Sequence, residues 1–390
     1  MKRPITRTRA VRVSSWCVAG FCVLLQASGA ADVTRGLPGG PAALLVDVRH
    51  DLVPLGIYET DATGEGEEDD SAAIQAAIDF VAEQGGGTVI IPPGVYRVAG
   101  IDVKPGVHLM GAGRKKTIFR AWSTGTMFRP TGGWMSDFSA YGTPDEQGSG
   151  ENWKVGTGGV GRGGTGRALH VIGIYGGVDV HIHNVRAMES RYDCLYTRGT
   201  RGLRVTNCHF DRAGRNVVSM VGDDEDFVFA NSYIGSHWGL YHFDIEPNAG
   251  KYVRDGLILN CTFDGRAAGQ LNTDTWGSML IFTGKENCAN VTVMACTFLD
   301  IKVRVRGVFP DVRFLYNHFD VRNRTFVKVR TNPVGEFENA LVRGNTFLVN
   351  GEPAELINYG VSFTGRSVFE GNTPEKFNDP RCERPMNGGT

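Results

Sequence analysis

The sequence predicts an all-β solenoid, in which the chain winds into stacked coils and one short helix covers the first coil. Three observations support this: a change from helical to strand periodicity within residues 69–113, an asparagine-centred motif that recurs from residue 178 onward, and 53 glycines in a chain of 390 residues with 21% charged residues. Short strands joined by tight turns need glycine at their corners, and each coil buries its apolar face against its neighbours. One elongated domain can therefore hold a large core.

Residues 69–113 begin with a predicted amphipathic helix. Its apolar stripe at helical spacing is formed by Ile74, Ile78 and Val81. Asp70 or Ser71 is expected to cap the helix by accepting hydrogen bonds from free backbone N–H groups. Glycines 85–87 end it, because glycine enters left-handed backbone conformations without a Cβ clash.

After these glycines the apolar pattern changes to period 2, which is typical of strands. Short strands are predicted at residues 89–91, 95–98, 101–103 and 107–110, with Pro- and Gly-containing turns between them. Residues 31–60 are expected to form a lead-in, with a first strand near residues 44–48.

A resemblance to a known family rests on these residues. The helix, the three glycines and the following Val-Ile-Ile-Pro-Pro-Gly-Val-Tyr resemble the N-terminal part of the pectate-lyase-like superfamily, which includes rhamnogalacturonase- and epimerase-like enzymes. The resemblance implies a right-handed parallel β-helix and a carbohydrate substrate. It leaves the reaction open, because one solenoid carries many chemistries. The Trp-x-Asp-His and Arg-x-Pro-x-x-Arg motifs of the best-known pectate lyases, and the Gly-His-Gly of polygalacturonases, do not occur.

Residues 1–30 are predicted to be a signal peptide. Five basic residues within residues 2–12 precede an apolar run at 16–25 that is too short to span a bilayer, and small residues follow at 28–30. The protein is therefore expected to be secreted, to the periplasm or outside the cell, without membrane contact after cleavage. A net charge of −1 gives no global field for binding nucleic acid.

Residues 31–380 are predicted to form one β-helix domain, and residues 381–390 a C-terminal tail. The protein is expected to be a monomer. A Gly-rich loop is expected to interrupt the domain at residues 122–168, because this stretch is too long for an ordinary connection. Its aromatic residues suit either stacking on sugar rings or packing of the loop on the protein.

The recurring motif defines the coils. Its asparagine is expected at a fixed corner, where it satisfies backbone groups and tolerates the bend. The motif positions are Asn184, Asn207, Asn231, Asn260, Ala295, Asn317 and Asn345. Cys208, Cys261 and Cys296 share the next position, which predicts stacked core thiols rather than disulfides. The sequence contains no Cys-x-x-Cys motif, so it gives no support for a structural zinc site.

A second strand in each coil is predicted to carry the chemistry. These strands are residues 194–198, 217–221, 242–246, 279–283, 302–306 and 326–330. In strand 242–246, alternation turns His242, Asp244 and Glu246 outward. Two carboxylates at this spacing can serve as an acid–base pair, and the alternatives are a solvated face or a calcium-ligand pair. Calcium is the one cofactor that the sequence leaves open.

A cationic set lies on the following coils at Lys302, Arg304, Arg306, Lys328 and Arg330. Stacked like charges are unfavourable unless a negative group binds between them. A uronate-containing polysaccharide would supply carboxylates, which arginine binds in a bidentate manner. Pairing with acidic residues on adjacent loops is the alternative.

Residues on neighbouring positions are predicted to complete the site. Asp193 and Arg215 precede the acidic strand and could extend the binding surface, with Arg215 positioning the carboxylates. Trp238 and Tyr241 border that strand and could supply a stacking face and an acid or base. Residues 223–226, Asp-Asp-Glu-Asp, are expected to form a solvated acidic corner, with calcium binding as the alternative.

These features predict a secreted enzyme that cleaves glycosidic bonds of a uronate-containing polysaccharide. In elimination, Lys302, Arg304, Lys328 and Arg330 would neutralise the carboxylate and abstract the proton, with His242 or Tyr241 assisting. Hydrolysis would instead use Asp244 and Glu246 around a water molecule. The cationic set favours a lyase over a hydrolase or a non-catalytic carbohydrate-binding β-helix. An epimerase would change sugar composition without shortening the polymer.

Overall fold

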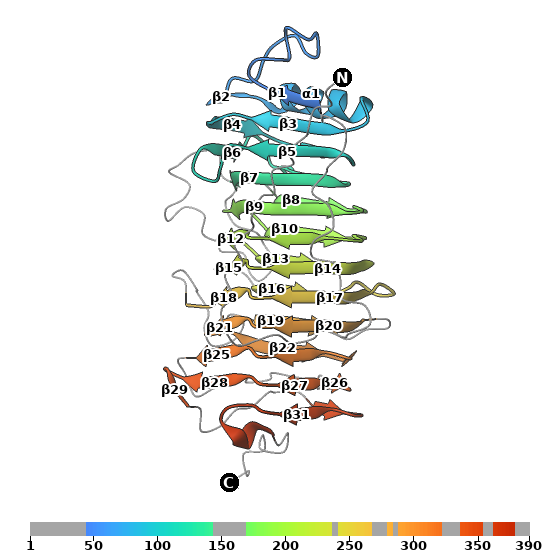
Figure 1. Ribbon diagram of the computed structural model, residues 1–390, viewed down its shortest axis with the longest axis vertical. Coiled ribbons are helices and arrows are strands. Elements are labelled where there is room, and N and C mark those ends of the chain that lie inside the picture. Colours follow the sequence, from blue (N-terminus) through green and yellow to red (C-terminus); the bar gives the residue numbers. More distant parts are fainter. Residues whose placement is uncertain are drawn as a thin grey trace, which may run out of the picture. The chain divides into compact units, whose positions relative to one another are not determined.

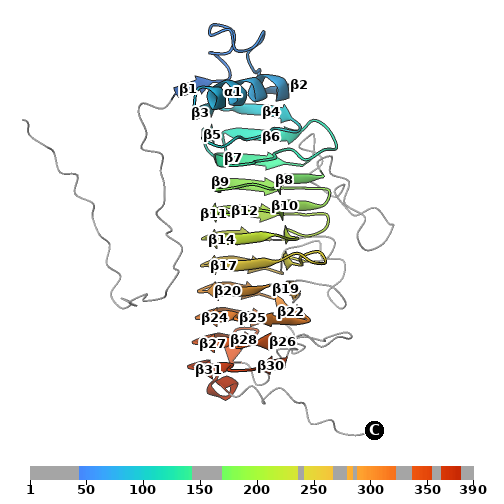
Figure 2. The same ribbon diagram turned by 90° about the vertical axis from the view of Figure 1, so that its right-hand side faces the viewer.

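A computed structural model describes residues 44–142, 169–235, 241–266, 279–283, 288–321, 336–353 and 362–378. From residue 44 onward the described chain winds into coils stacked on one another (Figures 1 and 2), and neighbouring coils pair almost entirely through parallel strands. The predicted right-handed parallel β-helix with an N-terminal capping helix is confirmed. The predicted signal peptide and C-terminal tail lie outside the described residues, as do Trp238, Lys328 and Arg330.

The largest sheet folds around the coils as two arms, which meet at a corner in each coil. The first arm contains β1 (Leu44–Asp47), β3 (Gly87–Ile91), β5 (Val107–Gly111), β11 (Arg204–Thr206), β14 (Asp224–Ala230), β17 (Val253–Leu259), β20 (Ala289–Met294), β24 (Arg313–Leu315), β27 (Leu341–Arg343) and β31 (Val368–Glu370). The second arm contains β2 (Glu65–Asp69), β4 (Gly94–Val98), β6 (Thr117–Ala121), β12 (His209–Asp211), β15 (Tyr233–Ile234), β18 (Thr262–Asp264), β21 (Thr297–Leu299), β25 (His318–Val321) and β28 (Thr346–Val349), to which β29 (Glu352–Pro353) pairs antiparallel. β7 (Gly133–Tyr141) and β9 (Val180–Met188) each run through both arms.

A separate sheet forms the third side of the coils, and we call it the six-stranded wall. It consists of β8 (His170–Tyr175), β10 (Asp193–Arg198), β13 (Val218–Met220), β16 (Phe243–Ile245), β19 (Met279–Thr283) and β22 (Lys302–Arg306). A three-stranded sheet of β23 (Val308–Pro310), β26 (Glu336–Glu338) and β30 (Ser362–Thr364) follows it along the chain. The core fills the space that these sheets enclose.

The capping helix α1 (Ser71–Glu83) buries the predicted stripe of Ile74, Ile78 and Val81. The prediction that the Asp70 side chain caps this helix is wrong. Its buried Oδ1 accepts from the Thr63 backbone N–H at 2.6 Å and so holds the lead-in to the first coil. Asp69 Oδ1 instead accepts from the Ser71 N–H at 3.0 Å. Three of the four predicted strands coincide with β3, β4 and β5, and β1 confirms the early strand. At residues 101–103 only an isolated bridge from Ile101 to Phe128 forms.

The prediction that residues 122–168 form a loop is wrong for residues 133–141. Residues 133–141 form β7, a full member of the coil stack, and Phe138 lies in the core. Gly133 has a positive φ of 75°, and a Cβ at that position would strike the Val107 carbonyl oxygen. Gly133 therefore serves a tight corner at the start of β7. Residues 143–168 lie outside the described residues.

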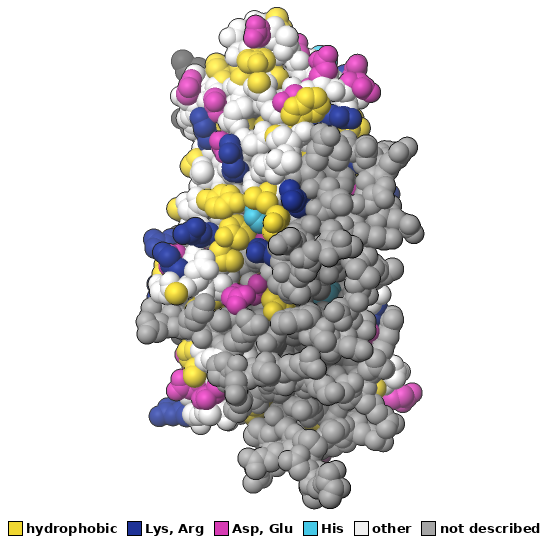
Figure 3. Space-filling model, turned by 180° about the vertical axis from the view of Figure 1, so that it is seen from behind, with side chains coloured by type: hydrophobic (Ala, Val, Ile, Leu, Met, Phe, Trp, Pro, Cys, Tyr) yellow, Lys and Arg dark blue, Asp and Glu magenta, His cyan; other side chains and the backbone are white. Residues whose placement is uncertain are grey.

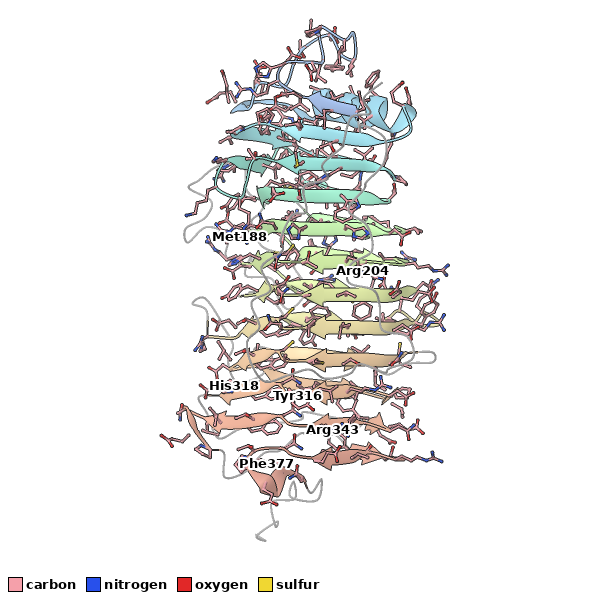
Figure 4. All side chains as sticks on the ribbon, viewed as in Figure 1. Met188, Arg204, Tyr316, His318, Arg343 and Phe377 are labelled. Atoms are coloured by element: carbon pink, nitrogen blue, oxygen red, sulfur yellow. The ribbon has the colours of Figure 1, made fainter. Side chains whose placement is uncertain are left out.

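The corner between the two arms has the predicted left-handed backbone. Asn184, Asn207, Asn231, Asn260 and Ala295 have φ values of 49–54°. The last two assignments are wrong by one residue, because Tyr316 (φ 56°; Figure 4) and Gly344 (φ 66°) occupy the corners there. Asn317 and Asn345 follow them and lie buried in the position that Cys208, Cys261 and Cys296 occupy in earlier coils.

This interior position forms a hydrogen-bonded ladder between coils. The Asn317 backbone N–H donates to Asn345 Oδ1 at 2.9 Å, and the Asn345 N–H donates to Asn372 Oδ1 at 3.0 Å. The Asn372 N–H donates to Asn378 Oδ1 at 2.8 Å, in the short helix η3 (Glu375–Asn378). In earlier coils the position holds Cys208, Ser232, Cys261 and Cys296, so that thiols of adjacent coils meet at Cys261 and Cys296. Cys208, Cys261 and Cys296 are free and buried, which confirms the predicted core thiols in place of disulfides, and Ser232 separates Cys208 from the other two.

Candidate functional site

The six-stranded wall carries the candidate site on its outer face. Its strands pair in register, so that Tyr196, Ser219 and Asp244 form one column across three successive coils. Phe243 and Ile245, on either side of Asp244, are buried in the core. Alternation therefore places Asp244 on the outer face, as the sequence predicts. Figure 3 views this side, and hydrophobic, cationic, acidic and histidine side chains lie next to one another on its described part.

His242 does not share that face. Its side chain is 0% exposed, and Nε2 lies 3.0 Å from the Asp264 carbonyl oxygen at the end of β18. The predicted alternation fails here because β16 begins only at Phe243, so residue 242 belongs to the corner and turns towards the next coil. Burial lowers the pKa of His242 to about 4, which keeps the imidazole neutral at pH 7. His242 is therefore a structural residue.

Tyr241 and Glu246 lie at the two ends of β16. Tyr241 is buried, and its backbone N–H donates to Asn216 Oδ1 at 3.1 Å. Glu246 is partly exposed, and its backbone N–H donates to the Met220 carbonyl at 3.0 Å. These bonds fix both residues to the preceding coil, beside Asp244.

Asn216 joins three coils at the centre of the site. Its side-chain Nδ2 donates to Asp244 Oδ2 at 2.8 Å and to Ser219 Oγ at 3.0 Å. Its backbone N–H donates to Asp193 Oδ1 at 3.1 Å in the coil before. Because the amide nitrogen can only donate, Asp244 Oδ2 is the acceptor in this bond.

Arg215 lies between two carboxylates. Its guanidinium makes a bidentate pair with Asp193, with Nε 2.9 Å from Oδ1. Burial lowers the pKa of Arg215, but the charges of Asp193 and then Asp244 more than offset this, so the pKa lies above its ordinary value. Asp193 itself is 0% exposed. The expectation that Asp193 binds substrate is therefore wrong, because its carboxylate is covered and holds Arg215 in place.

An aromatic strip crosses the wall beside this pair. It comprises Tyr192, His170, Tyr196 and Tyr175. The rings of His170 and Tyr196 stack with centroids 4.6 Å apart at 19°, and the Tyr175 ring lies 5.6 Å from that of Tyr196. Burial lowers the pKa of His170 to about 4, although Asp193 acts in the opposite direction. A neutral imidazole, three phenols and nearby guanidinium groups suit a sugar bearing a carboxylate.

The acidic and cationic strands share this wall, as the sequence predicts. Asp244 pairs in register with Ile281 of β19, and Ile281 pairs with Arg304 of β22. Val303 and Val305 of β22 pack on the core. The side chains of Lys302, Arg304 and Arg306 lie outside the described residues.

Comparisons with known proteins agree with the coil geometry. Residues 57–158 match the family model "Rhamnogalacturonase A/epimerase, pectate lyase-like". The chain is a pectate-lyase-like parallel β-helix. It is 46% identical over 67 residues to mannuronan C5-epimerase AlgE2 of Azotobacter vinelandii, which covers 15% of this chain and 7% of that protein. Alginate lyase 7 of the same organism is 45% identical over 67 residues, covering 15% of this chain and 8% of the lyase.

A solved structure extends the likeness in fold. The A-module of the A. vinelandii mannuronan C-5 epimerase AlgE4 superposes with a TM-score of 0.50 at 19% identity, covering 80% of this chain and 92% of the module. The curated sequence relatives are much longer, since the matched part spans only 7–8% of AlgE2 and the lyase. The similarity identifies the β-helix and leaves the site to be argued from its own residues.

The acidic corner of this pectate-lyase-like β-helix differs from expectation. Asp224 is fully buried and accepts from the Thr200 N–H at 2.9 Å and from Thr197 Oγ1 at 3.1 Å. Burial raises the pKa of Asp224 to about 6. The three other acidic side chains make ion pairs, for example Asp226 with Arg204. The corner ties coils together instead of being solvated.

Two further findings limit what the described residues can hold. In the parts of the chain that the structure describes, no three His, Cys, Asp or Glu side chains come together as a metal site. Across the same residues, no helix has the length and apolar character needed to cross a bilayer.

Sequence reasoning missed Tyr175, Tyr192 and above all His170. The signal was present, because His170 precedes the corner Asn184 by 14 residues and Asp193 precedes Asn207 by 14 residues. Equal offsets place the two residues at one position of consecutive coils, and they do pair in register. The assignment of residues 122–168 to a loop hid the coil to which β8 belongs.

The buried His242 predicts a pH dependence of stability for this pectate-lyase-like β-helix. Its pKa is about 4 in the folded chain and about 6.5 unfolded, so between these values only the unfolded chain binds the proton. Stability is then complete above pH 6.5 and falls as the pH drops. We expect His242→Gln, which keeps an N–H donor, to reduce the wild-type loss between pH 7 and 4.5 by about 2–3 kcal/mol in urea unfolding. The matched control is His50→Gln, at a side chain that is 72% exposed. An unchanged pH slope in His242→Gln would contradict this.

Proposed function

We propose that the protein is an enzyme that acts on a uronate-containing polysaccharide and removes the proton next to the uronate carboxylate. The observation that carries this is Asp244, a carboxylate 4% exposed on the outer face of the six-stranded wall, held by Asn216 and beside the Arg215 cation. Such a wall brings an acceptor for a proton and cations for a carboxylate to the same surface.

The chemistry needs three groups. A cation neutralises the substrate carboxylate, so that the negative charge formed when the adjacent carbon loses its proton is stabilised. A base accepts that proton, and the electron pair left on the carbon is delocalised into the neutralised carboxylate. In elimination this pair forms a carbon–carbon double bond as the bond to the leaving glycosidic oxygen breaks, and an acid protonates that oxygen. If a proton returns to the opposite face instead, the product is an epimer.

We assign Asp244 as the proton acceptor, because Asn216 Nδ2 donates to its Oδ2 and the Arg215 cation lies near it. Tyr241, which the same asparagine fixes beside Asp244, is the proposed proton donor. Lys302 is a further proposed catalytic group, and Glu246 would contact the substrate from the end of β16. The proposed substrate-binding residues, besides Arg215, are Arg304, Arg306, Lys328, Arg330 and Trp238.

The names of the relatives support this choice of chemistry. Mannuronan and alginate, the polymers named for the epimerase and the lyase, are polyuronates, and their reactions share the abstraction step. We favour elimination as the outcome because the wall also includes the cationic strand β22. Export to the periplasm or the medium would bring the protein to such a polymer.

A panel of polymers tests the proposal. The protein is incubated with alginate, polygalacturonate and neutral dextran while ultraviolet absorbance, reducing ends and sugar composition are followed. Elimination is expected to raise absorbance and reducing ends together on a polyuronate and to leave dextran unchanged. Reducing ends without absorbance would identify a hydrolase using Asp244 and Glu246. A changed sugar composition alone would identify an epimerase, and no change on any polymer would contradict an enzyme and favour a binding protein.

A further inference from the structure

We infer that Tyr175, Tyr196 and Arg198 form a substrate subsite that binds a non-reacting uronate sugar two coils before Asp244. This inference rests on the proposed function, because it takes the polymer bound at Asp244 as the ligand. The subsite sets how long a substrate must be, and it recognises a free carboxylate on a sugar that is not itself converted.

The two tyrosine rings supply the stacking face. Tyr175 ends β8 and pairs in register with Arg198 of β10. Its ring centroid lies 5.6 Å from that of Tyr196 at 41°, and Tyr196 is backed by the stacked ring of His170. A ring held from behind presents its remaining face without a large loss of side-chain entropy.

Glycine explains how Tyr175 reaches this position. Gly173 is the residue that pairs with Tyr196, and a Cβ on Gly173 would come within 2.9 Å of the Tyr175 ring. The missing side chain therefore leaves room for Tyr175 to lean back over the wall. Tyr175 is nevertheless 45% exposed, which is a large apolar surface to leave in water next to a polar face. A sugar ring would cover it.

Arg198 supplies the charge. It is exposed, and no carboxylate among the described residues pairs with its guanidinium. Nearby arginines are paired, Arg201 with Glu225 and Arg204 with Asp226. Burial raises the pKa of Tyr196, and the positive charges of Arg215 and Arg198 oppose this, so both cations lie near its hydroxyl. A guanidinium that no described carboxylate pairs with, beside two phenol rings, is suited to a sugar that bears a carboxylate.

The position separates this subsite from the reacting sugar. Tyr196, Ser219 and Asp244 form one column, so two coil steps, or about 10 Å, divide Tyr196 from Asp244. The small side chain of Ser219 lies between them. A ligand held by Tyr175 and Arg198 therefore contributes binding energy without touching the proton that is transferred, which is uniform binding of ground state and transition state.

Binding and kinetics of single variants test the subsite. Tyr175→Ala and Arg198→Gln are compared with wild type by retardation in native gels containing alginate or polygalacturonate, and by kcat and KM on the polymer that is converted. We expect each variant to bind about 3- to 10-fold more weakly and to raise KM by the same factor, with kcat within about twofold. The matched controls are Arg201→Gln, a paired exposed arginine, and Tyr316→Ala, an exposed tyrosine at the corner between the two arms.

The outcomes separate the subsite from the catalytic assignment. If the variants bind and turn over like wild type, the subsite is wrong and the proposed function stands. If kcat falls while KM is unchanged, these residues belong to the reacting centre and the subsite is also wrong. If wild type is retarded and the variants are not, but no polymer is converted, the subsite holds and the enzymatic proposal fails. If wild type is not retarded by either polyuronate, the subsite is overturned.

Discussion

Asp244→Asn is expected to lower kcat on a uronate polymer by about 10²- to 10⁴-fold, the usual range for the loss of a general acid or base. The amide keeps an oxygen that can accept from Asn216 Nδ2, so the bond at 2.8 Å can persist. It cannot take up a proton, however, which is the role proposed for Asp244. The measurement is the initial rate of ultraviolet absorbance increase, with urea unfolding to establish that stability is retained.

Asp226→Asn is the matched control for this substitution. Asp226 of β14 pairs with Arg204 of the adjacent strand β11 in the first arm, away from the six-stranded wall, and its side chain is half exposed. It should keep wild-type kcat, because its loss removes only a surface ion pair. A folded Asp244→Asn protein with kcat within tenfold of wild type would remove Asp244 from the proton-transfer step.

Arg215→Met is expected to destabilise the folded protein by about 3–5 kcal/mol at pH 7, because a buried ion pair loses one partner. Asp193 is 0% exposed, and in the variant its carboxylate would retain two polar partners. These are the backbone N–H of Asn216, 3.1 Å from Oδ1, and His170, whose Nδ1 lies 3.4 Å from Oδ2. Neither replaces the bidentate guanidinium, since His170 is neutral at this pH. The free energy of unfolding in urea measures the effect.

Two comparisons show whether the unpaired charge causes that loss. Asp193→Asn added to Arg215→Met should recover a large part of the stability, because the buried charge is gone. Arg201→Met removes an exposed partner of Glu225 and should cost at most about 1 kcal/mol. Equal losses in Arg215→Met and Arg201→Met would show that Asp193 is not an uncompensated charge in the variant.

The fold could be predicted because its causes are local in sequence. Period-2 alternation, glycine corners and the recurring asparagine each act within one coil. The two misassigned corners show the limit. A tyrosine at a left-handed corner is uncommon. Asn317 resembles a corner residue by type, but the core phenylalanine lies two positions after it, whereas it lies three positions after the true corner residues. Spacing to the core phenylalanine was a better guide than residue type.

The site was predictable only where alternation applies. Side-chain alternation predicted that Asp244 lies on the outer face of the wall and that β16 and β22 belong to one sheet, and the structure confirms both. It failed at His242, whose burial depends on a carbonyl 22 residues further along the chain. It also could not foresee that Asp193 is covered by Arg215, since both residues looked like surface charges in the sequence. Contacts between coils decide these cases, and they depend on coil length as well as pattern.

The ladder of buried asparagines has a direction that bears on how the chain can be shortened. Each of its backbone N–H groups, from Cys296 to Asn372, donates to the side-chain oxygen of an asparagine further along the chain, which is synthesised later. Asn378 supplies the last of these oxygens. A nascent coil at this position thus remains incomplete until the following turn of chain has emerged. Expression fragments that stop before residue 378 would leave an unsatisfied donor inside the final turn, whereas a stop just after it would not.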